Sequence, residues 1–333
     1  SMHDDFARTA RIAGLGACLP DRVVTNADLE KVVDTSDEWI RTRTGIRERR
    51  VVADDESIVD LIERAGREAM DDAGVDPKDV DLLIVATATV EQPIPATAAI
   101  AQPRLGVVNA ACFDLSAACS GFTYSLNVAR QFIATGAART VLIVGAECLS
   151  RYTDWTDRTT CVLFGDGAGS VVLQAAEPGE GILQIDWRTD GTYADLIAMP
   201  GGGSKYPPHS VESIEQRLPF IKMRGNETFK VAVRALTEIS ERVMERAGIV
   251  SKDLDLFIPH QANDRIIQAV GQRLGLDERQ VFVNVDRVGN TSAASIPLAL
   301  YDARAEGRLD RGDLVLMTAF GGGLTWGSAL MRY

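Results

Sequence analysis

Short apolar runs alternate along the chain with stretches in which apolar residues recur at helical spacing. The runs at 79–86 and 139–145 are largely apolar, which predicts strands that are buried on both faces. The stretches at 56–73 and 123–135 show helical spacing, which is typical of helices with one apolar face. Because buried strands that alternate with helices form layered sheets, we expect an α/β fold with parallel strands.

Smaller elements are predicted between these. They are a first strand at 11–16, a short helix at 26–33 capped by Asn26, a small-residue helix at 96–105 and a long surface loop at 200–219 that could act as a lid. Glycines at 163–173 could suggest a phosphate-binding loop, but no helix pattern follows them. We therefore interpret this segment as a tight, closely packed bend between strands.

The second half of the chain repeats the first. Residues 70–84 align without a gap on residues 244–258, at an offset of 174 residues. The apolar strand at Val141 also finds a counterpart at this offset. We therefore predict two related α/β halves, 8–178 and 179–333, that pack about a pseudo-dyad with a site where equivalent elements meet.

The composition is that of a soluble globular protein, with 46% hydrophobic and 25% charged residues among 333. This length suits one large or two ordinary domains. No apolar run is long enough to span a membrane, and residues 1–5 lack the basic and apolar regions of a secretory signal. The net charge of −12 argues against non-specific nucleic-acid binding.

The cysteines indicate a reducing compartment. Five are present, an odd number without CxxC spacing, which argues against a disulfide framework or a zinc site. We therefore expect free thiols, a cytoplasmic protein and no metal.

One cysteine, Cys119, is a candidate nucleophile. It lies in the run Asp114–Phe122, where small residues separate an apolar strand from the helix at 123–135. Unpaired backbone N–H groups at a helix start favour an anion, so we expect this thiol to lose its proton more easily than usual. The alternative is a buried structural cysteine, the commoner fate of a free thiol.

Two further candidates lie in the second half. Of the three histidines, only His260 lies at the end of a buried strand, since His3 lies in the N-terminal tail and His209 in a polar loop. His260 is thus the candidate for acid–base chemistry, with a core histidine bonded to backbone as the alternative. Asn290 lies among glycine and small residues before a helix, where a cap or turn residue is the alternative.

Two loops carry candidate binding chemistry. Residues 320–328 follow a strand and contain consecutive glycines, whose free backbone N–H groups could form part of an oxyanion hole. The run 35–50 is basic and contains Trp39 within an acidic protein. Arginine suits phosphate and tryptophan offers a stacking face, so this run is either a phosphate and purine contact or a solvated loop with a half-buried tryptophan.

Four of these segments together resemble the signatures of one family. They are 114–122 (DLSAACSGF), 260–263 (HQAN), 289–295 (GNTSAAS) and 320–327 (FGGGLTWG). Over nearly its whole length, the chain resembles the thiolase superfamily and, within it, the β-ketoacyl-acyl carrier protein synthase III family. The resemblance implies thiolase-like duplicated α/β halves, layered α-β-α-β-α about a pseudo-dyad, and a homodimer.

The resemblance also implies a decarboxylative Claisen condensation that initiates fatty acid biosynthesis. An acyl-coenzyme A primer would acylate Cys119, and malonyl-acyl carrier protein would then lose carbon dioxide and yield β-ketoacyl-acyl carrier protein. His260 and Asn290 would stabilise the enolate, and the N–H groups of Cys119 and Gly322 would form the oxyanion hole. No cofactor or metal is implied, because decarboxylation supplies the carbanion.

Further residues take binding roles by the same resemblance. Trp39 and Arg158 would sandwich the adenine of coenzyme A. The coenzyme A arm would be lined by Arg43, Thr44 and Asn226. Arg265 would meet the carrier protein.

Other activities stay open on the same scaffold. It resembles acyltransferases that pass the cysteine-bound acyl group to oxygen or nitrogen, and priming ketosynthases of secondary metabolism. A carrier-binding relative without catalysis is disfavoured, because the cysteine, histidine and asparagine are all present.

Two positions depart from the family pattern. Ile94 stands where many relatives carry an aromatic residue that reaches across the dimer as a gate of the acyl pocket, so we expect primers longer or more branched than acetyl. Asp264 stands where we expect an apolar residue, beside Arg265. An acidic carrier protein would bind less well to a surface with this added negative charge.

Overall fold

Two large sheets form the framework of the protein. The computed structural model describes residues 8–333, so the expectations for residues 1–5, including His3, lie outside the described residues. The first sheet has the order β1-β7-β6-β4-β5, with β1 (Thr9–Cys18), β7 (Gly167–Ala176), β6 (Thr140–Glu147), β4 (Leu82–Ala86) and β5 (Ala111–Leu115). The second has the order β11-β12-β13-β8, with β11 (Leu256–Pro259), β12 (Leu314–Gly321), β13 (Thr325–Arg332) and β8 (Gly181–Thr189).

The expectation of parallel strands is correct only for part of each sheet. Strand β4 pairs parallel with β5 and β6, and β11 pairs parallel with β12. The other pairs are antiparallel. Strands β12 and β13 illustrate the reason, because residues 322–324 alone connect them, and so short a connection leaves no room for the crossover that a parallel pair needs.

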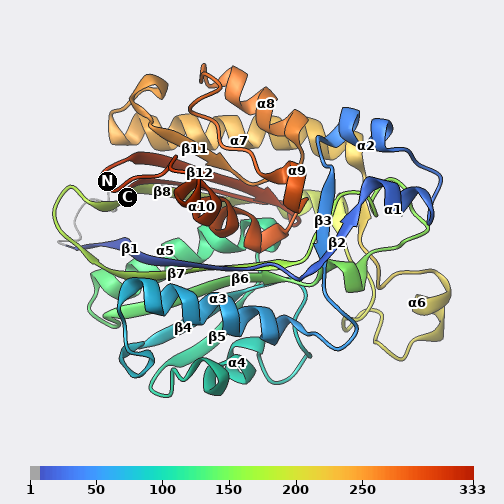
Figure 1. Cartoon of the computed structure of the whole chain (residues 1–333), viewed down its shortest axis with the longest axis horizontal. Coiled ribbons are helices and arrows are strands. Elements are labelled where there is room, and N and C mark those ends of the chain that lie inside the picture. Colours follow the sequence, from blue (N-terminus) through green and yellow to red (C-terminus); the bar gives the residue numbers. More distant parts are fainter. Residues whose placement is uncertain (1–7) are drawn as a thin grey trace.

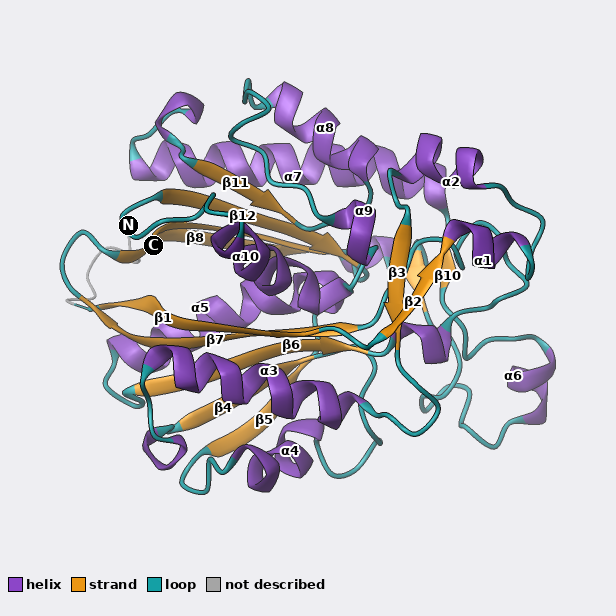
Figure 2. Ribbon diagram, in the orientation of Figure 1, coloured by secondary structure: helices purple, strands orange, loops and turns teal. Residues whose placement is uncertain are grey.

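Helices complete five layers (Figure 1). The outer layers are formed by α3 (Ile58–Ala73) with α4 (Thr97–Leu105), and by α7 (Gly225–Ala247) with α8 (Asp264–Arg273). The central layer, between the sheets, is formed by α5 (Gly121–Ala134) and α10 (Ser295–Ala305). Figure 2 shows the same alternation of helices and strands. The predicted α-β-α-β-α fold is thus confirmed.

The central helices are buried because they face both sheets. Phe122 and Leu126 of α5 belong to one apolar cluster with Ile84 of the first sheet and Met317 of the second. By contrast, α3 buries one side, and Gly74 ends it in the left-handed conformation at φ 65°. Apolar packing on two sides therefore fixes where α5 begins, and with it the turn that precedes this helix.

The offset of 174 residues reappears in the structure. Strand β6 begins at Thr140 and β12 at Leu314. A 3₁₀ turn at Ala118–Ser120 precedes α5, and an equivalent turn at Ser292–Ala294 precedes α10. Both turns begin with a non-glycine residue at positive φ, 47° at Ala118 and 51° at Ser292. The division into halves 8–178 and 179–333 stays a prediction, and these matches support it.

The region before α3 differs most from the expected elements. Its elements are β2 (Arg22–Thr25), α1 (Asn26–Glu30), α2 (Asp37–Thr44) and β3 (Glu48–Val51). Thr25, not Asn26, caps α1 by accepting the Asp28 N–H. Asn26 is buried instead, and its Nδ2 donates to Asp37 and to the Ile46 carbonyl. The run 35–50 thus contains a helix where the solvated-loop alternative expected none.

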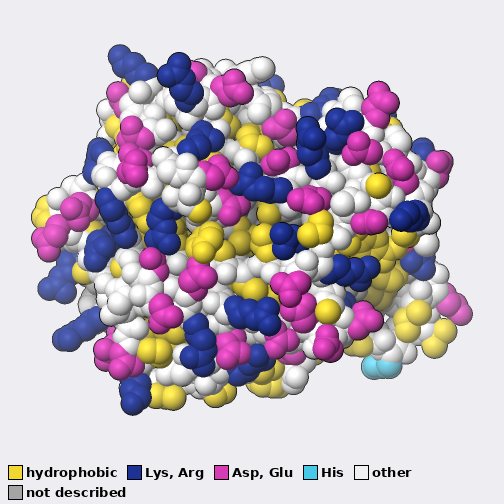
Figure 3. All heavy atoms as spheres, in the orientation of Figure 1, with side chains coloured by type: hydrophobic (Ala, Val, Ile, Leu, Met, Phe, Trp, Pro, Cys, Tyr) yellow, Lys and Arg dark blue, Asp and Glu magenta, His cyan; other side chains and the backbone are white. Residues whose placement is uncertain are grey.

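Short elements also occupy the other connections. They are α6 (Val211–Glu215) within the predicted loop 200–219, β9 (Ile197–Ala198), β10 (Lys222–Met223) and α9 (Val285–Val288). No helix within residues 8–333 has the length and apolar character needed to cross a membrane. No cluster of three or more metal-ligating side chains is present in the same residues. Figure 3 shows basic and acidic side chains interspersed over one face.

Candidate active site

Cys119 lies in the 3₁₀ turn that connects β5 to α5, as the sequence predicts. The residue keeps some solvent exposure. The glycine loop after β12 lies directly against it, because a Cβ added to Gly321 would be 2.6 Å from the Cys119 nitrogen. Thr325 fastens this loop by donating its hydroxyl to the Ala117 carbonyl over 3.0 Å. Only a glycine fits at position 321, and the loop therefore presents bare backbone to the cysteine.

The charge state of Cys119 differs from the sequence-based expectation. Burial raises the pKa of the Cys119 thiol to about 12, the charge of Glu147 adds to this, and hydrogen bonding by Ser292 opposes it. The expectation that this thiol is easy to deprotonate is therefore wrong, because burial disfavours the charged thiolate. In the resting site the sulfur carries a proton, and attack requires a group that accepts it.

His260 follows β11 and is neutral. Its backbone N–H donates to the Thr318 carbonyl over 2.8 Å, and its side chain is 2% exposed. Burial lowers the pKa of His260 to about 3, so the imidazole is uncharged at pH 7. Its Nδ1 is buried and has no hydrogen-bond partner among the described residues.

Asn290 is held from both sides. Its backbone N–H donates to Leu163 over 2.8 Å, and its carbonyl accepts from Gly165 over 3.0 Å. A Cβ on Gly165 would be 2.2 Å from the Val288 oxygen, which confirms that the 163–173 bend serves close packing. The side-chain Oδ1 accepts the Ser292 N–H over 2.9 Å. Its Nδ2 is therefore the end that remains to donate.

These residues converge where the N-terminal turns of α5 and α10 meet. Ser292, two residues after Asn290, lies close to the Cys119 side chain and lowers the pKa of its thiol. Next to His260, the Gln261 N–H donates to the Ser295 hydroxyl at the start of α10 over 2.7 Å. The arrangement places a thiol, a neutral imidazole and an oriented amide in one region, which suits chemistry on a thioester.

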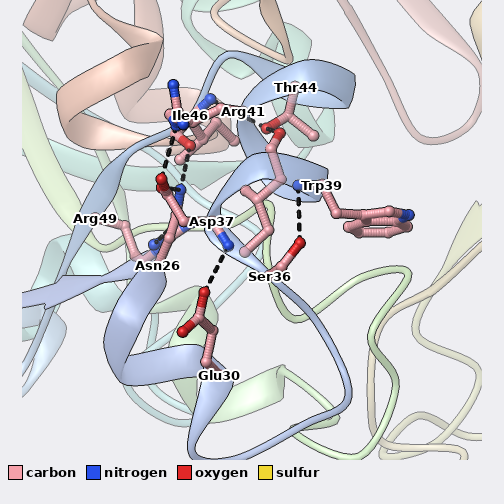
Figure 4. A network of polar contacts seen from close by, with 10 residues as sticks. Asn26, Glu30, Ser36, Asp37, Trp39, Arg41, Thr44, Ile46 and Arg49 are labelled. Atoms are coloured by element: carbon pink, nitrogen blue, oxygen red, sulfur yellow. Dashed lines mark hydrogen bonds and ion pairs between the residues drawn. The ribbon is translucent and has the colours of Figure 1, made fainter.

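The aromatic and basic residues of the run 35–50 lie on α2. The guanidinium carbon of Arg43 is 4.7 Å from the centre of the Trp39 ring, and that of Arg158 is 6.0 Å away. Arg158 also pairs with Asp34. Figure 4 shows the Trp39 side chain pointing away from the polar network that Asn26 and Asp37 form. An aromatic ring and two guanidinium groups thus lie together at this surface.

Other predicted binding residues occupy different environments. Thr44 is buried, and its hydroxyl donates to the Ile40 carbonyl at the end of α2. Asn226 is exposed in the first turn of α7. Arg265 is exposed on α8, with its guanidinium carbon 5.6 Å from the Phe229 ring centre. The structure thus groups Trp39, Arg43 and Arg158, whereas the Thr44 hydroxyl faces inward.

Two residues of this region were missed by the sequence analysis. Glu147, the last residue of β6, is fully buried, and the nearby Ser292 side chain lowers the pKa of both its carboxyl and the Cys119 thiol. An acidic residue at the end of an apolar strand is a signal that could have pointed to Glu147. The signal for Ser292 is weaker, because serines are common before helices.

Comparisons with known proteins agree along the whole chain. The family model 3-oxoacyl-[acyl-carrier-protein (ACP)] synthase III matches residues 113–191, and the model of its C-terminal part matches 244–333. The beta-ketoacyl-[acyl-carrier-protein] synthase III of Alkalilimnicola ehrlichii is 53% identical over 325 residues, which are 97% of this chain and 99% of the relative. That of Symbiobacterium thermophilum is 52% identical over 326 residues, 98% of each chain.

Solved structures give the same result. The 3-oxoacyl-[acyl-carrier-protein] synthase III from Aquifex aeolicus VF5 superposes with a TM-score of 0.90 at 47% identity, covering 97% of this chain and 100% of the other. The priming β-ketosynthase from the R1128 polyketide biosynthetic pathway has a TM-score of 0.91 at 38% identity, covering 97% and 96%. The chain belongs to the β-ketoacyl-acyl carrier protein synthase III family.

Proposed function

We propose that this protein condenses an acyl-coenzyme A primer with malonyl-acyl carrier protein, with loss of carbon dioxide, to give β-ketoacyl-acyl carrier protein and initiate fatty acid biosynthesis. The single observation that carries this proposal is that the turn of Cys119 lies against both the glycine loop and the turn before α10, to which the segments of Asn290 and His260 are hydrogen-bonded. A malonyl-dependent assay of carbon dioxide release tests it, because simple acyl transfer to oxygen or nitrogen releases none.

In the first half-reaction, Cys119 sulfur attacks the thioester carbonyl of the primer. The N–H groups of Cys119 and Gly322 hold the oxyanion of the tetrahedral intermediate. This role is supported by the position of Gly322, where an added Cβ would lie 3.7 Å from the Ala118 Cβ. The intermediate then collapses, the acyl group stays on sulfur, and coenzyme A leaves.

In the second half-reaction, the malonyl group loses carbon dioxide and becomes a thioester enolate. His260 and Asn290 donate hydrogen bonds to the enolate oxygen, which carries full charge only during reaction. The neutral state of His260 and the fixed amide of Asn290 support this role. The enolate carbon then attacks the acyl-cysteine, and the thiolate of Cys119 leaves. Because decarboxylation supplies the carbanion, this route needs no metal or organic cofactor.

Coenzyme A would enter over α2. Trp39 and Arg158 would hold the adenine between them, and Arg43 would meet phosphate. Asn226 would contact the arm from α7, and Thr44 would act through its backbone, because its hydroxyl is engaged within the helix. This placement is supported by the two guanidinium groups that lie near the Trp39 ring.

Trp39→Ala is expected to raise the KM for acyl-coenzyme A while kcat changes little. Stacking of a base on an aromatic ring contributes about 1–3 kcal/mol, so KM should rise roughly 5- to 150-fold. Steady-state kinetics with varied acyl-coenzyme A measure this effect. Trp187→Ala is the control, since Trp187 is also a half-exposed tryptophan, on β8. An unchanged KM for Trp39→Ala would contradict the assignment.

The carrier protein would dock on α8 at Arg265. Its neighbour Asp264 lies in the first turn of α8, where a carboxylate is stabilised by the helix dipole. Its Cβ would be 2.6 Å from a Cβ on Gly45, and its Oδ1 accepts from Gln268 over 3.0 Å. These contacts give Asp264 a structural reason to be there, and the exposed Arg265 remains available to an acidic partner.

A homodimer would form along strand β5. This strand is the edge of the first sheet, and four of its five residues are only half-buried. Unpaired edge strands tend to pair with another chain. The apolar side chains of Ile94 and Val108 are 83% and 59% exposed, which favours a partner that covers them.

A cytoplasmic location is supported by the five cysteines, all of which are free.

Ile94→Phe is expected to shift primer preference towards acetyl. In the proposed dimer Ile94 reaches the partner's acyl pocket, and a larger ring would shorten it. Each methylene in an apolar pocket discriminates by about 10- to 200-fold, so the longest primers should lose most. The measurement compares acetyl-, isobutyryl-, hexanoyl- and dodecanoyl-coenzyme A. Val250→Phe adds a ring at an exposed position between α7 and β11 as the control, and identical chain-length profiles for wild type and Ile94→Phe would refute the gate.

A second candidate function is the priming of a secondary-metabolic pathway. The likeness to the priming β-ketosynthase of the R1128 pathway favours it, and both candidates share the same condensation. Intact-protein mass spectrometry after exposure to the primer panel distinguishes them by which acyl group remains on Cys119.

A further inference from the structure

Glu147 is a buried carboxyl that the mechanism above does not use. Its side chain is 0% exposed, and no ion pair to it is present within residues 8–333. Its Oε1 accepts three hydrogen bonds, from the Thr87 hydroxyl over 2.6 Å, the Ala88 N–H over 2.7 Å and the Thr89 hydroxyl over 3.2 Å. Its Oε2 is buried and has no hydrogen-bond partner among the described residues. Oε1 thus anchors the carboxyl, and Oε2 remains available to accept a proton.

Ser292 stands between this carboxyl and the thiol of Cys119. Its side chain lies close to both groups and lowers the pKa of each. The turn that carries Ser292 presses against the end of β6, because a Cβ on Gly145 would be 2.1 Å from the Ala293 oxygen. The Ser292 N–H is bound to Asn290, which fixes the backbone of the turn. The thiol, the hydroxyl and the carboxyl therefore form one buried chain of polar groups.

The low polarity of the region limits the chain to a single negative charge. Burial raises the pKa of Glu147, and it raises that of Cys119 to about 12. The charge of Glu147 raises the pKa of Cys119 further, and also those of Cys148 and Tyr152 nearby. His260 is neutral and adds no positive charge. A thiolate is therefore stabilised when the carboxylate takes up a proton at the same time.

We propose that Glu147 accepts the Cys119 proton through the Ser292 hydroxyl when the sulfur attacks its acyl donor, a role that rests on the proposed function of Cys119. The S–H bond breaks and its proton passes to Ser292 Oγ, while the Ser292 O–H proton passes to Glu147 Oε2. The negative charge moves from carboxylate to sulfur, and the net charge is unchanged. When condensation later expels the Cys119 thiolate, the proton returns by the same route. Coenzyme A leaves as a thiolate and takes its proton from solvent.

Glu147→Gln tests this proposal, because glutamine keeps an oxygen for the Thr87 and Thr89 hydroxyls but loses both the negative charge and the ability to accept a proton. The readout is the pH profile of Cys119 alkylation by iodoacetamide in the full chain, followed by intact mass. This reaction needs no acyl-coenzyme A, so its outcome is independent of the proposed function. The apparent pKa should rise, and each unit corresponds to a roughly tenfold slower alkylation at pH 7.

The two roles open to Glu147 predict opposite changes in the alkylation rate of Cys119 when Glu147 is replaced by glutamine. If its charge merely repels the thiolate, Glu147→Gln will speed alkylation and lower the apparent pKa, and the proposal is overturned. Ser292→Ala should slow alkylation as Glu147→Gln does, and an unchanged rate would exclude the relay. Glu147→Asp keeps an ionisable carboxyl, so Cys119 should be alkylated faster in this variant than in Glu147→Gln. Equal rates in the two variants would count against the relay. Thermal unfolding of each variant establishes that the fold is retained.

Discussion

Cys119→Ala is expected to abolish acyl-enzyme formation completely. Cys112→Ala, Cys148→Ala and Cys161→Ala should still be acylated. Thiol acidity does not make this distinction, because burial raises the pKa of Cys112 and Cys161 to about 11 and that of Cys119 to about 12. Position does, since only Cys119 combines partial exposure, the glycine loop and the Ser292 hydroxyl.

Intact-protein mass spectrometry after incubation with acyl-coenzyme A measures this result. The acyl mass should appear on wild type and on the three control variants, and peptide mapping should place it on Cys119. Cys148 and Cys161 are buried and Cys112 is half-buried, so each control also reports whether a small cavity alone affects acylation. An adduct on another cysteine, or acylation of Cys119→Ala, would refute the assignment.

His260→Ala and Asn290→Ala are expected to lose malonyl decarboxylation more than acylation of Cys119. Removing one donor to a developing oxyanion typically costs about 100- to 1,000-fold in rate. Acylation should be less affected, because the thiol proton leaves through Ser292 and Glu147 in the route proposed above. Carbon dioxide release and acyl-enzyme formation, measured separately for each variant, give the two rates.

His209→Ala is the control for the histidine, because His209 is exposed in the loop 200–219. It should leave both half-reactions unchanged. Equal losses of decarboxylation and acylation in His260→Ala would mean that His260 also serves the thiol, and would contradict this division of roles. A loss confined to acylation would mean that His260 serves the thiol and not the enolate.

The layers and the reactive residues were predictable because each leaves a local pattern. Strands β4 and β6 appear as apolar runs, and the cysteine and histidine lie at the ends of strands, where side chains of different elements meet. The repeat was readable because residues 70–84 and 244–258 align without a gap. These features depend on neighbours in sequence, and periodicity reports such neighbours well.

Features that depend on distant segments were not predictable. Asn26 is not a helix cap because its side chain is drawn to Ile46 and Arg49, which only the folded chain brings near. The pKa of Cys119 is raised, whereas the sequence led us to expect a lowered one, because desolvation comes from the whole surrounding protein. Glu147 and Ser292 lie 145 residues apart and acquire a shared role only through the packing of β6 on the turn before α10.

The matching left-handed turns at Ala118 and Ser292 also bear on how such an enzyme can evolve. If they descend from one duplicated ancestor, that ancestor placed two like turns face to face, each able to carry a nucleophile. The copies now differ, because one turn carries a thiol at Cys119 and the other a hydroxyl at Ser292, at positions that do not correspond in the repeat. Each copy then became part of the environment that selects mutations in the other. Chimaeras that exchange one copy between distant relatives should therefore fold more often than they catalyse.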